Sequence, residues 1–133
     1  MPIVDVTHGP QVSEEQLVRL ARELPHAVSL AVECPEEPYD EALRPGDVEV
    51  RFHARGPYDV SGLDVVVEVR SKWFPSRAEN RQERSDQLCD AIAAAAGTHS
   101  VGIYLSLPVA AWAQGDEGTT GVTRPVRPAD ERG

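Results

Sequence analysis

The stretch PIVDVT at residues 2–7 sets the pattern on which the fold prediction rests. It joins a proline to a short run rich in β-branched residues, which is typical of a β-strand. The segment SEEQ at 13–16 has a serine followed three residues later by a glutamine, a capping box that starts a helix. We expect this helix to bend at Pro25 and to end near residues 34–38. Its apolar residues recur at helical spacing: Leu17, Leu20, Ala21, Leu24 and Val28.

The rest of the chain completes this unit and repeats it. Residues 47–55 alternate apolar and polar side chains as a strand does, and LDVVVEVR at 63–70 predicts a strongly β-branched third strand. A second capping box, SRAE at 76–79, predicts a helix that ends at Gly97, and VGIYLSL at 101–107 predicts the last strand. We therefore predict an α/β (α+β) fold of two β-α-β repeats, with both helices on one face of a four-stranded sheet.

The other face of such a sheet has no helix to cover it. We expect apolar side chains on that face, and we therefore predict oligomerisation through it, with cover by long loops as the alternative. From about Gln114 onward the composition turns to Gly, Thr, Pro, Asp, Glu and Arg. This composition predicts a flexible tail over residues 114–133.

Charge and composition narrow the function classes. The 133 residues suit one domain, and the net charge of −9 argues against a nucleic-acid partner, because phosphate binding needs clustered Lys and Arg. No apolar run is long enough to span a bilayer and no leader is recognisable, so we expect no membrane partner. The cysteines, Cys34 and Cys89, lack metal-ligand spacing. We expect two free thiols in a cytoplasmic protein without metal or cofactor.

Pro2 is the first candidate for catalysis. An initiator methionine before a small residue is usually removed, and removal would make Pro2 the chain terminus. A terminal proline is a secondary amine and a base, whereas an internal proline nitrogen is an amide without a basic lone pair. An α-amino group titrates near ~8, and neighbouring cations would lower the pKa of the Pro2 amine toward neutrality.

Three stretches of the chain resemble the tautomerase superfamily, and together they cover about residues 2–115. MPIVDVTHG with SEEQLVRLAREL is similar to the first strand and helix of 4-oxalocrotonate tautomerase. VEVRFHA, LDVVVEVRS and SRAENRQE resemble 5-carboxymethyl-2-hydroxymuconate isomerase, and VGIYLSLPVAAWAQG resembles the last strand of these proteins and the turn after it. The resemblance implies a homotrimer and a domain over residues 1–113, with repeats at about 2–58 and 61–113.

The resemblance also implies a site. Pro2 would be the catalytic group, held by its strand at a sheet edge in a pocket shared between subunits. Cations would bind the carboxylate of a small substrate and stabilise the enolate oxygen. Family members place an arginine just before the helix-capping serine, where this chain has Val12 and Pro75, so which cation takes that role is open. The substrate-binding candidates are Arg70, Arg51, Arg77, Lys72 and, as the aromatic wall of the pocket, Trp112.

The activity expected from the resemblance is keto-enol tautomerisation of a small 2-oxo acid or 2-hydroxydienoate. Two alternatives stay open: a dehalogenase or decarboxylase of the same superfamily, and a non-catalytic trimeric binding protein with the same fold. Dehalogenases and hydratases need an additional carboxylate that activates water. The acidic stretch PEEPYDE at 35–41 is most simply interpreted as a solvated loop, so the sequence identifies no such carboxylate.

Overall fold

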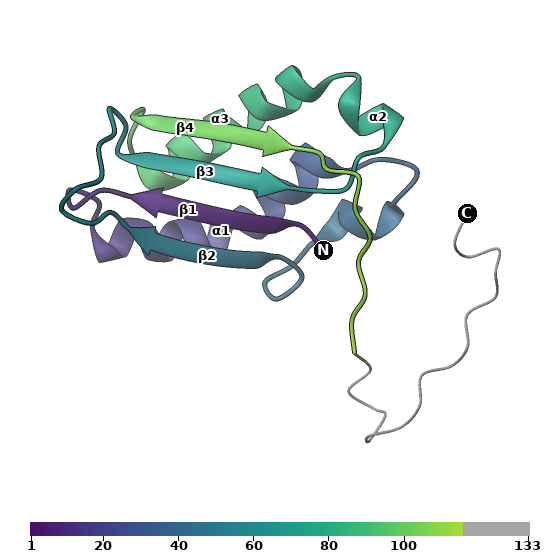
Figure 1. Cartoon of the computed structure of the whole chain (residues 1–133), viewed down its shortest axis with the longest axis horizontal. Helices are drawn as coiled ribbons and strands as arrows, with labels where there is room; N and C mark the ends of the chain where they lie inside the picture. The colour runs from purple at the N-terminus through teal and green to yellow at the C-terminus, as the bar shows by residue number, and fades with distance from the viewer. Residues whose placement is uncertain (116–133) are drawn as a thin grey trace.

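The computed structural model describes residues 1–115, which form one mixed sheet with helices on one face (Figure 1). The strand order is β2-β1-β3-β4, with β1 parallel to β2, β3 parallel to β4, and β1 antiparallel to β3. This confirms the predicted pair of β-α-β repeats. The elements are β1 (Ile3–His8), α1 (Glu14–Val32), the 3-10 helix η1 (Pro38–Ala42), β2 (Glu49–Ala54), β3 (Val65–Arg70), α2 (Pro75–Ala78), α3 (Arg81–Ala96) and β4 (Val101–Ser106). The predicted flexible tail lies, from residue 116 on, outside the described residues.

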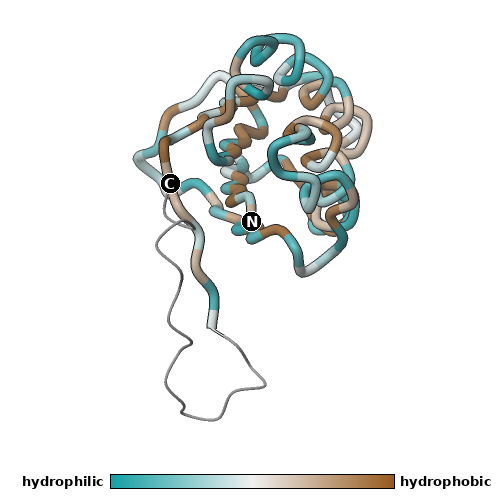
Figure 2. The backbone as a smooth tube through the Cα atoms, turned by 90° about the vertical axis from the view of Figure 1, so that its right-hand side faces the viewer, coloured by the Kyte–Doolittle hydropathy of each residue, from teal (hydrophilic) through white to brown (hydrophobic). Residues whose placement is uncertain are grey.

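The core lies between the sheet and the helices (Figure 2). Val4 and Val6 of β1 are fully buried, as are the alternate residues Val65, Val67 and Val69 of β3. Leu20, Leu24 and Val28 of α1, and Leu88 and Ile92 of α3, complete the core from the helical side. Burial of a side chain of this size contributes about 1.5–3 kcal/mol.

Helix α1 starts as predicted and continues through its proline. Ser13 is the N-cap: its hydroxyl accepts from the Gln16 amide at 3.2 Å, and the Gln16 side chain accepts from the Ser13 amide at 2.7 Å. The helix includes Pro25 and ends at Val32, slightly before the predicted end.

The start of the second helical segment differs from the prediction. Ser76 is not an N-cap: α2 is already helical from Pro75, and its N-cap is Phe74. The Ser76 hydroxyl instead donates to the Glu36 carboxylate, and the long helix α3 begins only at Arg81. Ser76 therefore binds a carboxylate that lies far along the chain and does not cap the helix. The predicted end is confirmed, because Gly97 caps α3 with a left-handed φ of 69°, which glycine adopts without steric cost.

The two long helices cap each other. Near the start of α1, Gln16 and Arg19 donate to the last carbonyls of α3, Ala96 at 2.8 Å and Ala95 at 3.1 Å. At the other end, Arg84 of α3 donates to carbonyls at the end of α1, those of Ala31 at 3.0 Å and Glu33 at 2.8 Å. Carbonyls at the C-terminal ends of both helices, which have no partner within their own helix, therefore accept hydrogen bonds from the other helix.

The sheet face opposite the helices is uncovered, but the prediction that it is apolar is wrong. Asp5 lies at its centre and accepts from His53 at 2.7 Å and from Arg70 at 2.6 Å. The hydrogen bond from His53, followed by the charges of Arg70 and Arg51, holds the pKa of Asp5 below its usual value. This polar face also carries Thr7, Glu49, Glu68, Tyr104 and Ser106, with Ile3 and Val66 as apolar members.

Candidate active site

Strands β1, β2 and β3 meet at the N-terminal end of β1. Strand β1 begins at this end and the antiparallel strand β3 ends there, so that Ile3 pairs with Arg70. Ile3 also pairs with Glu49 of β2, and the Glu49 amide donates to the Pro2 carbonyl at 3.1 Å. Pro2 is buried. Because β1 is an inner strand, Pro2 stands at the end of a central strand, and the predicted sheet-edge location is wrong.

Met1 lies between two pockets at this end. The larger, about 330 Å³, is lined by Glu37, Tyr39, Asp40 and Gln114, and we call it the acidic pocket. The smaller, about 140 Å³, is lined by Ile3, Arg70, Ser71, Pro108, Ala110 and Ala111, and we call it the basic pocket. Met1, Lys72 and Trp112 line both. Pro2 itself lines neither pocket, and removal of Met1 would take away one of the three residues that the two pockets share and make Pro2 the first residue.

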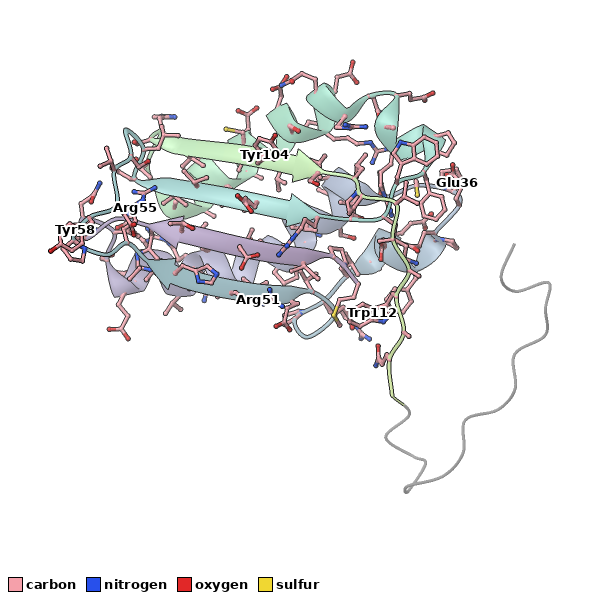
Figure 3. The ribbon with its side chains drawn as sticks, viewed as in Figure 1. Glu36, Arg51, Arg55, Tyr58, Tyr104 and Trp112 are labelled. Carbon is pink, nitrogen blue, oxygen red and sulfur yellow. The ribbon has the colours of Figure 1, made fainter. Side chains whose placement is uncertain are left out.

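Three of the predicted binding residues lie at these pockets. Arg70 lines the basic pocket and donates to Asp5. Lys72 lies at the boundary, where its ammonium group donates to Glu37 at 2.6 Å. Trp112 lines both pockets, and Figure 3 shows it near the end of the sheet where β1 begins.

The other two predicted binding residues have different surroundings. Arg51 lies on the uncovered face of β2, where its guanidinium is 3.3 Å from Glu49, and it lines neither pocket. Arg77 is fully buried, with Asp40 at 2.9 Å and Glu37 at 3.4 Å. A side chain without exposed surface offers no donor to a substrate in this conformation.

The acidic stretch 35–41 is not simply the solvated loop that the sequence suggested. Asp40 is only 1% exposed, and its Oδ1 has no hydrogen-bond partner among the described residues. Burial, together with the neighbouring carboxylate of Glu37, raises the pKa of Asp40 to about 6, against the opposing charges of the N-terminal amine and Arg77. Burial acts to raise the pKa of Glu37 too, but the hydrogen bond and charge of Lys72, with the charge of Arg77, hold it below its usual value.

Ser29 explains why Asp40 is buried. Its hydroxyl donates to the Asp40 carbonyl at 2.7 Å and accepts from the Leu43 amide at 3.1 Å, so the buried face of α1 anchors η1. A serine between Val28 and Val32 on an apolar helix face is the sequence signal that could have revealed this contact.

Residues 1–115 contain no group of three or more His, Cys, Asp and Glu side chains arranged to hold a metal ion. No helix in the described part of the chain has the length and apolar character needed to cross a membrane.

Solved structures with the same architecture identify the fold. A fused 4-OT symmetric trimer is 17% identical, with a TM-score of 0.56 over 80% of this chain and 85% of that chain. The chain shares the fold of this fused 4-OT protein. A malonate semialdehyde decarboxylase is 17% identical (TM-score 0.57, covering 86% of this chain and 92% of that one). A macrophage migration inhibitory factor-like protein from Entamoeba histolytica is 15% identical (TM-score 0.54, 81% and 89%).

At the level of sequence, no family model and no curated protein matches this chain. The resemblance seen in the sequence is therefore confirmed as a shared fold.

Proposed function

We propose that the chain is a tautomerase that acts on a small 2-oxo acid or 2-hydroxydienoate, with the amine of Pro2 as general base. The observation that carries the proposal is the position of Met1 between two pockets that share Lys72 and Trp112. Once Met1 is cleaved, the Pro2 nitrogen would be a basic secondary amine next to these pockets.

The pocket residues suit each step of this chemistry. Arg70 and Lys72 would bind the substrate carboxylate in or beside the basic pocket, where Ala110, Ala111 and Trp112 supply apolar contacts. The neutral Pro2 amine would remove a proton from the carbon next to the carbonyl and return it elsewhere on the conjugated system. The same cations would stabilise the enolate oxygen that develops between the two transfers.

A homotrimer in the cytoplasm is part of the proposal. The similarity to fused 4-OT trimers supports the assembly. Because the uncovered sheet face is polar, it would contribute polar contacts to such a trimer and not an apolar interface. Two free thiols, Cys34 and Cys89, fit a reducing compartment.

A second candidate is hydration or decarboxylation of a small carboxylate substrate. Asp40 and Glu37 favour it, because they bring to the pocket the carboxylates that the sequence interpretation lacked. In hydration, a cationic Pro2 amine would donate its proton to one carbon of a substrate double bond, while a carboxylate takes a proton from the water whose oxygen bonds to the other carbon. In decarboxylation, the cationic amine would donate a hydrogen bond to the substrate carbonyl oxygen and stabilise the enolate that forms as CO₂ leaves. The similarity to malonate semialdehyde decarboxylase, whose structure is described as a basis for decarboxylase and hydratase activities, supports it.

The pH dependence of kcat/KM separates these candidates. Protein with a processed N-terminus is assayed with phenylpyruvate for tautomerisation and with malonate semialdehyde for decarboxylation. A general-base amine gives activity that rises with pH through the amine pKa, whereas a cationic amine gives activity that falls. If the processed protein binds these compounds without turnover, the non-catalytic binding protein becomes the better description.

A further inference from the structure

The buried guanidinium of Arg77 contacts two backbone carbonyls, two carboxylates and an aromatic ring. Its Nε donates to the Val32 carbonyl, and its Nη1 donates to the Lys72 carbonyl at 2.8 Å. Its Nη2 donates to Asp40 Oδ2 at 2.9 Å and to Glu37 Oε1 at 3.4 Å. The guanidinium also lies over the Phe74 ring, 5.3 Å from the centroid.

These contacts join three segments from both repeats. Val32 ends α1 of the first repeat, Glu37 and Asp40 follow it in the acidic pocket, and Lys72 belongs to the loop after β3 in the second repeat. The relative positions of the two carboxylates and the Lys72 backbone are therefore set through one planar group.

We propose that Arg77 is a positioning residue, which orients Asp40 and the Lys72 segment toward the N-terminal nitrogen without touching substrate. The catalytic meaning of this role rests on the proposed function. The geometry needs an arginine, because the rigid fork donates in several fixed directions at once, whereas a lysine ammonium is a compact point charge on a flexible chain.

Several titratable groups share this environment: Cys34, Glu36, Glu37, Asp40, Lys72 and the N-terminal amine. Among them, Asp40 is the most informative reporter, because it is buried and pairs directly with the guanidinium. Removing one partner of a buried pair leaves the other charge uncompensated. Loss of the Arg77 contact should therefore favour protonated Asp40.

The test compares Arg77→Lys with Arg19→Lys in processed full-length protein. Arg19 is a matched control, since it also donates to a helix carbonyl but lies near the opposite end of α1. The readouts are kcat and KM for the substrate turned over by the wild type, the pH profile, and the Asp40 carboxyl titration by ¹³C NMR, assigned with Asp40→Asn. We expect Arg77→Lys to lower kcat/KM at least tenfold and to move the Asp40 midpoint upward, while Arg19→Lys changes neither.

An unchanged kcat/KM and an unmoved Asp40 midpoint in Arg77→Lys would overturn the proposal, as would equal losses in both variants. If Arg77→Lys does not fold, Arg77→Met combined with Asp40→Asn removes both charges together. A folded double variant with at least tenfold less activity than Asp40→Asn alone supports positioning of the Lys72 segment, and equal activity refutes it.

The titration needs no turnover, so the two proposals fail separately. A wild type without turnover, together with a moved Asp40 midpoint, rejects only the proposed function. An active wild type with an unmoved midpoint and unchanged kinetics in Arg77→Lys rejects only the role of Arg77.

Discussion

The two ends of the sheet are built by equivalent parts of the two repeats, yet their chemistry differs. Pro2 precedes β1 at one end, and Asp64 precedes β3 at the other. The backbone nitrogen of Asp64 is a peptide amide that donates to the Ser100 carbonyl at 3.0 Å. Figure 3 shows Arg55 and Tyr58 at this second end, far from Trp112. The free Pro2 amine that the proposed function needs has no counterpart at the Asp64 end, where the equivalent backbone nitrogen is a peptide amide, so the repeated fold alone does not make a site.

The connections between helix and strand add a second difference. Residues 33–48 join α1 to β2 in the first repeat, whereas residues 97–100 join α3 to β4 in the second. The longer connection contains η1 and supplies Glu37 and Asp40 to the acidic pocket. The pocket at the Asp64 end, about 370 Å³, is lined instead by loop residues that include Gly9, Arg55 and Asp59.

The largest expected effect comes from blocking the Pro2 nitrogen. One alanine inserted between Met1 and Pro2 turns that nitrogen into an amide, and we expect kcat to fall by about 10²–10⁴-fold, the usual contribution of a general acid-base group. The measurement is steady-state turnover, with intact mass confirming the processed terminus. An alanine inserted after Ser61, in the exposed loop at the other end, is the control and should leave turnover unchanged. Equal turnover of the two insertion variants would contradict a role for Pro2.

A smaller effect is expected from Arg70→Ala. Loss of a charged hydrogen bond to the substrate carboxylate should lower kcat/KM by about ten- to a hundredfold. The expected change lies mainly in KM, and Arg55→Ala at the opposite end should have no such effect. If both variants keep the wild-type KM, Arg70 does not bind substrate.

Asp40 gives a pH-dependent prediction for stability. Its folded pKa of about 6 lies above the unfolded reference of 3.8, so between these values the folded state binds more protons than the unfolded state. The contribution of Asp40 to the free energy of unfolding should therefore decrease as pH rises from about 4 to about 6. Denaturant unfolding of wild type and Asp40→Asn isolates this part, because the difference between them should vary with pH in that window. A difference that stays constant from pH 4 to 6 would contradict the raised pKa.

The smallest effects test the reciprocal helix caps. Arg19→Ala and Arg84→Ala should each lower the free energy of unfolding by about 1–2 kcal/mol, because each leaves helix-terminal carbonyls without a donor. We expect the larger loss for Arg84, which donates to Ala31, Glu33 and Ser76, than for Arg19, which donates to Ala95. Urea denaturation measures both, and a larger loss for Arg19→Ala would reverse this order.

Much of the fold could be predicted because its signals are local. The capping box at Ser13, the left-handed cap at Gly97 and the β-branched strands each depend on neighbouring residues. The polarity of the uncovered face was also present in the alternation of residues 49–53, where Glu49, Arg51 and His53 share one side. That prediction failed because a face without helices was assumed to be apolar, although the sequence already placed charges on it.

The sequence by itself determined the order of strands and helices along the chain, the repeat, and the position of Pro2 next to Met1. Only the tertiary structure decided that Asp40 and Arg77 are buried together and that Arg51 stays outside the pockets. The acidic stretch 35–41 has the composition of a solvated loop, and most of it is exposed, but Asp40 is buried where Ser29 of α1 and Arg77 of the second repeat bind it. The ionisation of a carboxyl follows the burial and charges around it, so long-range packing determines the chemistry of this pocket.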